Sequence, residues 1–175
     1  MENTVWQGKF IKVTLEDIEG QTFERAYIPD GVVIFPVDDH GRILVIREKR
    51  PHETPSVRLK PVTGMLDEGE IPLENAQREL QEEIGFKAAD LHEFWTLRSS
   101  GTVNSTTHFF LAKGLTPSKL PNPDGEDVIE EILALSLDDL RHRINSEEMR
   151  WGVSVMGFLR LEMLVAQGRF SLAPR

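Results

Sequence analysis

Alternating and continuous apolar runs divide the chain into short segments that predict β-strands. These segments are residues 9–16, 21–28, 31–37, 42–49, 91–98, 106–113 and 128–135, with a shorter extended segment at 58–63. Short polar turns join the first six segments in pairs, which predicts three hairpins. The runs at 31–37 and 42–49 are apolar almost throughout, which indicates central strands covered on both faces.

Helical periodicity is clearest after residue 71, where Leu73, Ala76, Leu80 and Ile84 recur at spacings of three and four. Pro72 suits the first turn of this predicted helix and Gly85 suits its end. Further helices are expected from Ser136, with Asp139 as its capping partner, and over 153–167, ending at Gly168. Strands alternating with a few helices predict an α/β sandwich, in which helices cover both faces of a mixed sheet.

The composition narrows the classes of protein. At 175 residues the chain has room for one domain with a full core, and the absence of cysteine excludes disulfides and thiolate metal sites. No secretory signal or membrane-spanning run is visible, so a cytoplasmic location without a membrane partner is expected. The net charge of −9 argues against nucleic acid as a partner.

The predicted helix from residue 72 lies in the most acidic stretch of the chain, residues 64–86, which holds six glutamates and one aspartate. Glu79, Glu82 and Glu83 share one flank of this helix, roughly 5–6 Å apart, which is unfavourable without a cation. Their hard oxygen donors favour Mg²⁺, with Mn²⁺ as a substitute, over zinc. The alternative is a solvated acidic face, as for most charge runs.

The same stretch resembles the Nudix box. Every defined position of that motif is present in order, namely Gly64, Glu70, Arg78, Glu79, Leu80, Glu82, Glu83, Gly85 and Phe86. The resemblance implies a Nudix-type α/β/α sandwich and hydrolysis of a diphosphate linkage. It also implies that Glu79, Glu82 and Glu83 hold the metal, together with the backbone carbonyl of Thr63.

Other box residues are expected to support these ligands. Gly64 permits a tight turn before the helix. Arg78 is expected to pair with a box glutamate and fix its rotamer, with Glu70 as a further partner in this arrangement. A surface ion pair of little energetic value is the alternative for Arg78.

A base that activates water is still needed. In the ADP-ribose pyrophosphatase-like branch of the family it is a glutamate on a loop after the box. The loop predicted at 114–127 therefore makes Glu126 the first candidate, with Glu130 and Glu131 as alternates and a box glutamate such as Glu82 also open.

Similarity to this branch extends outside the box, through Trp6, residues 23–27 and residues 47–51. Arg25 and Arg50 are candidate substrate ligands, since a guanidinium binds phosphate oxygens; a surface charge at a strand end is the alternative for Arg50. Trp6 could stack on a base in a dimer, although a buried packing role is favoured. Residues 1–30 form a predicted hairpin region and possible dimerisation arm of a homodimer, and residues 31–175 the Nudix domain.

Two segments depart from the branch. Residues 60–63 read Lys-Pro-Val-Thr where the branch often has Glu-Leu-Pro-Ala, and Ser100 and Ser105 replace a proline and an acid. The expected activity is Mg²⁺-dependent cleavage of a nucleoside diphosphate sugar, ADP-ribose-like, to a nucleoside monophosphate and a sugar phosphate. Alternatives are a nucleoside triphosphate or dinucleoside polyphosphate pyrophosphohydrolase, or a catalytically silent nucleotide-binding regulator.

Overall fold

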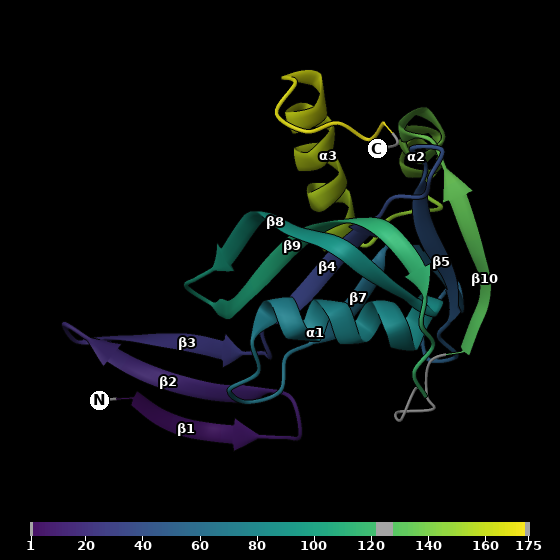
Figure 1. Cartoon of the computed structure of the whole chain (residues 1–175). Helices are drawn as coiled ribbons and strands as arrows, with labels where there is room; N and C mark the ends of the chain where they lie inside the picture. Colours follow the sequence, from purple (N-terminus) through teal and green to yellow (C-terminus); the bar gives the residue numbers. More distant parts are fainter. Residues whose placement is uncertain (1, 122–127, 174–175) are drawn as a thin grey trace.

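The computed structural model describes residues 2–121 and 128–173, and Figure 1 shows their arrangement. A seven-stranded mixed sheet runs in the order β1-β2-β3-β9-β4-β7, with β8 also paired to β9. Its strands are β1 (Glu2–Gln7), β2 (Lys12–Ile18), β3 (Gln21–Tyr27), β4 (Gly31–Pro36), β7 (Val62–Met65), β8 (Phe86–Ser99) and β9 (Val103–Pro117). The long strand β9 is its centre, because it pairs in parallel with β3 and β4 and antiparallel with β8.

A second, three-stranded sheet has the order β10-β5-β6, with β5 (Ile43–Lys49), β6 (Val57–Lys60) and β10 (Val128–Leu135). The predicted hairpin between 31–37 and 42–49 is therefore wrong. Only an isolated bridge joins Val37 to Ile43, and β4 and β5 enter different sheets. The predicted extended segment at 58–63 likewise splits at Pro61 into β6 of the small sheet and β7 of the large one.

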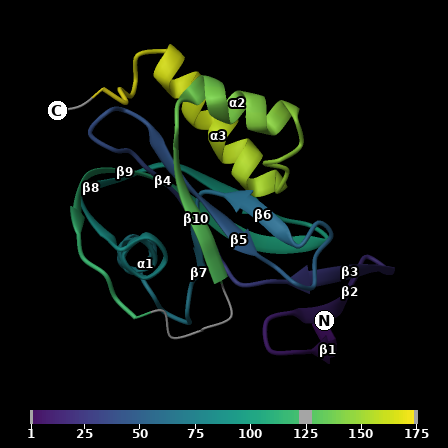
Figure 2. The ribbon, with the colours of Figure 1, turned by 90° about the vertical axis from the view of Figure 1, so that its right-hand side faces the viewer.

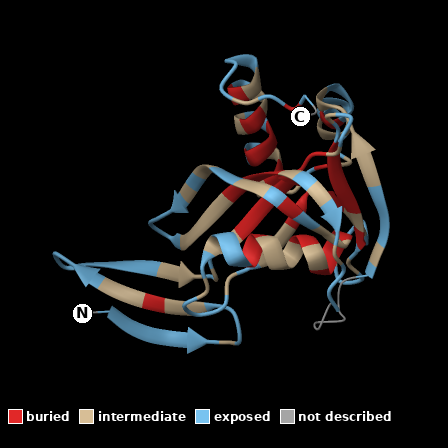
Figure 3. Ribbon diagram, viewed as in Figure 1, coloured by how far each residue is buried: buried red, intermediate tan, exposed pale blue. Residues whose placement is uncertain are grey.

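Helices cover both faces of this β-layer (Figure 2). Helix α1 (Pro72–Glu79) and the π-helical turn η1 (Leu80–Ile84) pack on one face, and α2 (Leu137–Asn145) and α3 (Gly152–Ala166) on the other. The alternation of β4 divides the core in two: Val32 and Ile34 face α1, whereas Val33 and Phe35 face α3. The predicted α/β/α sandwich is confirmed, and Figure 3 shows its buried centre.

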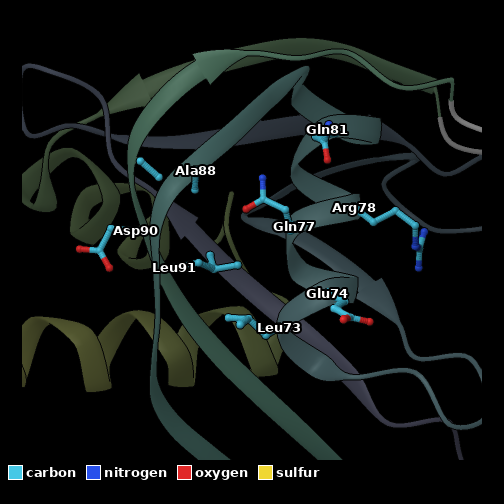
Figure 4. Close-up of a pocket in the computed structure, with 9 residues that line it drawn as sticks. Leu73, Glu74, Gln77, Arg78, Gln81, Ala88, Asp90 and Leu91 are labelled. Atoms are coloured by element: carbon cyan, nitrogen blue, oxygen red, sulfur yellow. The ribbon is translucent and has the colours of Figure 1, made fainter.

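The acidic helix differs from its predicted form in two ways. After Glu79 it continues as a π-helix up to Gly85, which ends it in the left-handed conformation at φ 76°. Leu73 does not join the core: it is 48% exposed and lines an outer groove of about 610 Å³ between α1 and β8. In Figure 4, Leu73 and Gln77 point toward β8, whereas Arg78 points to the other side of α1. Asn75 is buried instead and donates to the Met65 carbonyl.

The N-terminal region contains more than the predicted hairpin. The turn between β2 and β3 forms at Glu19 and Gly20, both with positive φ, and β1 adds a third antiparallel strand. Trp6 on β1 is 54% exposed, so it does not have the favoured buried packing role within the single chain. Its indole ring lies over Gly8, whose α-carbon leaves the space that a side chain would fill.

The remaining predictions agree closely with the structure. Strands β8 and β9 form the predicted hairpin but are longer, and β9 takes up the first four residues of the expected loop at 114–127. Ser136 and Asp139 form the capping box of α2, and α3 ends just before Gly168. No helix in the described part of the chain is long and apolar enough to cross a membrane.

Candidate active site

Gly64 brings the box helix against β7. It lies within that strand, so the tight turn expected there does not occur. A Cβ built on Gly64 would lie 2.3 Å from the carboxyl group of Glu79. Glycine is therefore needed because the Glu79 carboxylate rests directly on the backbone of β7.

Arg78 gathers three box carboxylates. Its Nε donates to Glu70 Oε1 at 3.1 Å, and its Nη1 lies 2.8 Å from Glu82 Oε2 and 3.0 Å from Glu79 Oε1. Glu70 also accepts from Asn75 and from the backbone N–H of Asp67. A guanidinium with several fixed partners loses little freedom on pairing, so Arg78 sets the rotamers of both Glu79 and Glu82.

Glu83 has a separate cation. The ammonium of Lys60 lies 3.0 Å from Glu83 Oε1, and the backbone N–H of Thr63 donates to Glu83 Oε2 at 3.1 Å. Burial would lower the pKa of Lys60, but the carboxylates of Glu83 and Glu48 raise it above its usual value. Lys60 is thus a charged ammonium inside the protein, adjacent to the box carboxylates.

Burial raises the pKa of Glu79 to about 8. The charges of Glu83 and Glu82 act in the same direction, and the positive charge of Arg78 offsets only part of this rise. A carboxyl group in this position favours an additional cation. The oxygen donors of the box fit Mg²⁺ or Mn²⁺. Within residues 2–121 and 128–173, however, no three acidic or histidine side chains are arranged to hold a metal ion. Arg78 and Lys60 instead hold Glu82 and Glu83 in separate ion pairs.

Two cavities open beside these carboxylates. The cavity that we call basic, about 470 Å³, has Thr63, Gly64 and Glu79 in its wall together with the cationic side chains Arg50, Arg58 and Lys60. The carboxylates Asp30 and Glu53 also line it. The acidic cavity, about 440 Å³, is lined by Glu82, Glu83, Lys119, Glu130 and Glu131, among others. The box therefore supplies carboxylates to both cavities.

The three candidate bases are placed differently. Glu126 lies outside the described residues. Glu130 and Glu131 both line the acidic cavity with Glu82 and Glu83, and Glu131 pairs with Arg47 at 3.5 Å. The register of β10 against β5 shifts between Ile129 and Glu131, so Glu130 is the extra residue of a β-bulge. Bulges often redirect side chains next to active sites.

The structure separates the three candidate substrate ligands. Arg50 lines the basic cavity and also binds Glu48. Arg25 instead pairs with Glu16 and donates to the Gly101 carbonyl, which ties β3 to the β8–β9 turn. Neither Arg25 nor Trp6 lines a described cavity beside the box in the single chain.

Four further residues at the site were not singled out from the sequence: Lys60 and Trp151 line the basic cavity, Lys119 lines the acidic cavity, and the buried Glu48 pairs with Lys60 and Arg50. The Arg58 guanidinium lies over the Trp151 ring, 4.9 Å from the ring centre, and Trp151 lines the basic cavity. Lys119 donates to the Glu82 carbonyl. The sequence offered one signal for Glu48 and Lys60, because each is a charged residue in a strand that also contains buried apolar residues.

Substituting Gly64 by alanine tests the packing of Glu79. The new methyl group would displace the Glu79 carboxylate, and misplacing a reacting group by about 1 Å can cost about 100-fold in rate. We expect kcat to fall by roughly that factor while the free energy of unfolding changes by less than about 1 kcal/mol, because the clash is with a flexible side-chain end. Gly152→Ala is the control, since no atom lies within 4 Å of its Cβ position; equal losses in both variants would contradict this role.

The pKa of Glu79 predicts a pH dependence of metal binding. Its ordinary value is 4.5 and its value in the folded protein is about 8, so between these pH values the folded chain holds a proton that the unfolded chain has released. Stability of the metal-free protein should therefore fall as pH rises through this window. Metal must displace the same proton, so Mn²⁺ affinity should rise from pH 6 to pH 8 with proton release, measured by calorimetry in two buffers. A pH-independent affinity would contradict the assignment.

Comparison with known proteins identifies the family of the chain. A family model, the NUDIX domain, matches residues 28–152. The chain is 30% identical over 152 residues to an ADP-ribose pyrophosphatase of Bacillus subtilis, covering 83% of this chain and 81% of that protein. It is 35% identical over 143 residues to the ADP compounds hydrolase NudE of Escherichia coli, covering 80% and 74%.

Two other relatives extend the comparison. A methanol dehydrogenase activator of Bacillus methanolicus is 27% identical over 168 residues, covering 91% of this chain and 89% of that protein. A crystal structure of an ADP compounds hydrolase superposes with a TM-score of 0.78 at 25% identity, covering 97% of this chain and 95% of that one. From the box, the fold and these matches together, the chain belongs to the Nudix family and is a Nudix hydrolase.

Proposed function

We propose that the protein is a Mg²⁺-dependent pyrophosphohydrolase that cleaves the diphosphate linkage of a nucleoside diphosphate sugar into a nucleoside monophosphate and a sugar phosphate. One observation carries the proposal. The box carboxylate of Glu79 opens into the same cavity as Arg50, Arg58 and Lys60, so a site for a metal and a site for an anion are continuous. Guanidinium groups bind phosphate oxygens, and the charge of a bound metal would add to the attraction for a diphosphate.

Metal bound by Glu79, Glu82, Glu83 and the Thr63 carbonyl would neutralise phosphate charge and acidify a water. The chain supplies the rest. Arg50 and Arg58 bind and orient the diphosphate oxygens. A carboxylate base takes a proton from the attacking water; the water oxygen bonds to one phosphorus while the bridging oxygen leaves with the other phosphate and receives the proton.

One observation supports an adenosine diphosphate compound as substrate, and a second concerns its sugar. The relatives described above include an ADP-ribose pyrophosphatase and an ADP compounds hydrolase. Ser105, one of the positions at which the sequence departs from the ADP-ribose branch, lines the basic cavity, so this departure contacts the space proposed for substrate. We therefore keep the sugar open between ribose and another group.

We also propose a homodimer formed through the N-terminal sheet. This sheet exposes large apolar side chains at positions from β1 to β3, namely Val5, Trp6, Phe10, Ile11, Ile18 and Phe23, and exposed apolar patches of this kind mark interfaces. Phe10 and Ile11 also line the basic cavity. Trp6 and Arg25 would reach substrate only across such a dimer. Light scattering of the full chain and of Trp6→Ser should give a dimer and a weaker dimer, respectively.

A substrate screen tests the proposed reaction. Nucleoside diphosphate sugars, dinucleoside polyphosphates and nucleoside triphosphates are supplied with Mg²⁺ or Mn²⁺, and monophosphate products are measured. We expect the highest kcat/KM on an ADP-sugar. Preference for triphosphates or dinucleoside polyphosphates would move the protein to the alternative pyrophosphohydrolase class, and binding without any turnover would favour a regulator.

The similarity to a methanol dehydrogenase activator supports a second candidate function, the activation of a dehydrogenase. The same screen includes a methanol dehydrogenase assayed with and without this protein. Activation that survives Glu82→Gln would indicate an accessory protein. Activation lost together with hydrolysis would make it a consequence of the hydrolase activity.

A further inference from the structure

Lys60 occupies an unusual position for a lysine. It ends β6, is 1% exposed, and its ammonium uses all three of its hydrogen-bond directions inside the protein. The acceptors are Thr63 Oγ1 at 2.8 Å, Glu83 Oε1 at 3.0 Å and Glu48 Oε1 at 3.0 Å. Lysine is almost never fully buried unless it is paired, and here two carboxylates share one ammonium.

The second carboxylate, Glu48, has its own further partner. Glu48 on β5 is fully buried, and Arg50 donates to it with Nε at 2.6 Å and Nη2 at 3.1 Å. Glu48 therefore forms ion pairs with two cations, Lys60 and Arg50. Glu83 pairs with Lys60 and accepts a hydrogen bond from the Thr63 N–H. Burial would raise the pKa of Glu48, but Lys60 and Arg50 lower it below its usual value, so Glu48 is an anion that competes with Glu83 for the ammonium.

We propose that Lys60 is a fixed cation of the metal centre and a positioning residue for Glu83. Its ammonium holds Oε1 of Glu83 while the Thr63 N–H holds Oε2, so the carboxylate cannot rotate. The same ammonium places a positive charge beside a proposed metal ligand, which weakens the binding of a divalent cation. The negative charge of Glu48 compensates part of the ammonium's charge and so reduces this effect. The proposal rests on the proposed function, in which Glu83 binds the metal.

Two substitutions should move metal affinity in opposite directions. Lys60→Gln keeps an N–H donor but removes the charge, so Mn²⁺ should bind roughly tenfold more tightly. Glu48→Gln removes the competing anion and leaves the ammonium to Glu83 alone, so Mn²⁺ should bind several-fold more weakly. A merely structural role for Lys60 would weaken binding in both variants. Free Mn²⁺ is measured by electron paramagnetic resonance without substrate.

Controls separate this proposal from the proposed metal site. Arg58→Gln removes a cation from the same cavity, but one whose carboxylate partner is Glu53, so Mn²⁺ affinity should change less than about twofold. If Lys60→Gln does not fold, the double variant Lys60→Gln with Glu48→Gln removes one charge of each sign and should still tighten binding. Unchanged or weaker binding in the folded lysine variants would overturn the role of Lys60. If Glu83→Gln left Mn²⁺ binding intact, the proposed metal site itself would fail.

Discussion

Glu83→Gln is expected to lower kcat by about 10³-fold or more, which corresponds to a loss of about 4 kcal/mol of transition-state stabilisation. The amide keeps the size of the side chain and can still accept from Lys60 or the Thr63 N–H, the two contacts that hold Glu83 in place. It cannot supply a carboxylate charge to a divalent cation. The loss should therefore appear as weaker metal binding and lower kcat, with a folded protein.

The control for this variant is Glu74→Gln on the same helix. Glu74 is exposed and lines the outer groove between α1 and β8, away from the proposed metal. The two substitutions remove the same charge from one helix, at positions nine residues apart. Turnover measured at saturating Mg²⁺ should fall only in Glu83→Gln. A Glu83→Gln variant with normal kcat and normal Mn²⁺ affinity would remove Glu83 from the metal site.

Replacement of the base should produce the second large effect. A positioned general base contributes about 10²- to 10⁴-fold to rate, so its glutamine variant should lose kcat by that factor and keep Mn²⁺ affinity near the wild-type value. Glu126→Gln is the first variant to measure, because the resemblance predicts it. Glu130→Gln is the second, because the β-bulge turns Glu130 out of the ladder and the residue lines the acidic cavity.

Glu131→Gln is the matched control in the same segment. Glu131 is paired with Arg47, so its loss should change kcat less than about threefold. A steep loss in Glu126→Gln alone, or in Glu130→Gln alone, identifies the base. Normal turnover in both variants would return the role to a box glutamate, and Glu82 would then be the next to test.

The sequence predicts the elements of this fold well because burial leaves a periodic pattern. The apolar stripe Ala76, Leu80 and Ile84 is buried as expected, and Gly85 and Ser136 end and begin helices where their backbone and capping properties require. The same pattern does not identify strand partners. Both β4 and β5 are buried runs separated by a short turn, yet they belong to different sheets, because apolar content records burial and not pairing.

For the candidate site, too, the sequence predicts the residues that are close along the chain but not those that only the fold brings together. The box positions are contiguous in sequence, so their spacing alone groups Glu79, Glu82 and Glu83 on one element. Lys60 contacts Glu83, 23 positions away, and Glu48, 12 positions away. No local pattern in the sequence shows which of these distant charged residues pair. The π-helical turn at Leu80–Ile84 is also hidden, since its apolar residues fit an α-helix equally well.

The exposure of Trp6 has a similar explanation. Large aromatic residues are buried on average, and from the sequence this average favours packing against the body of the protein. In the fold, β1 is the outermost strand of an extension that joins the main sheet through the pairing of β3 with β9. In the single chain the Trp6 ring lies over its own turn at Gly8 and is 54% exposed, which is the reason for proposing that a second chain covers it.

The most direct test of the central claim, that the box carboxylates hold a divalent metal, is a crystal structure of the protein grown with Mn²⁺ and a non-hydrolysable ADP-sugar analogue. Anomalous scattering locates Mn²⁺ independently of the refined side chains. We expect Mn²⁺ to be coordinated by the carboxylates of Glu79, Glu82 and Glu83 and by the Thr63 carbonyl, and the diphosphate of the analogue to lie in the basic cavity. Mn²⁺ bound elsewhere, with these carboxylates still held by Arg78 and Lys60, would contradict it.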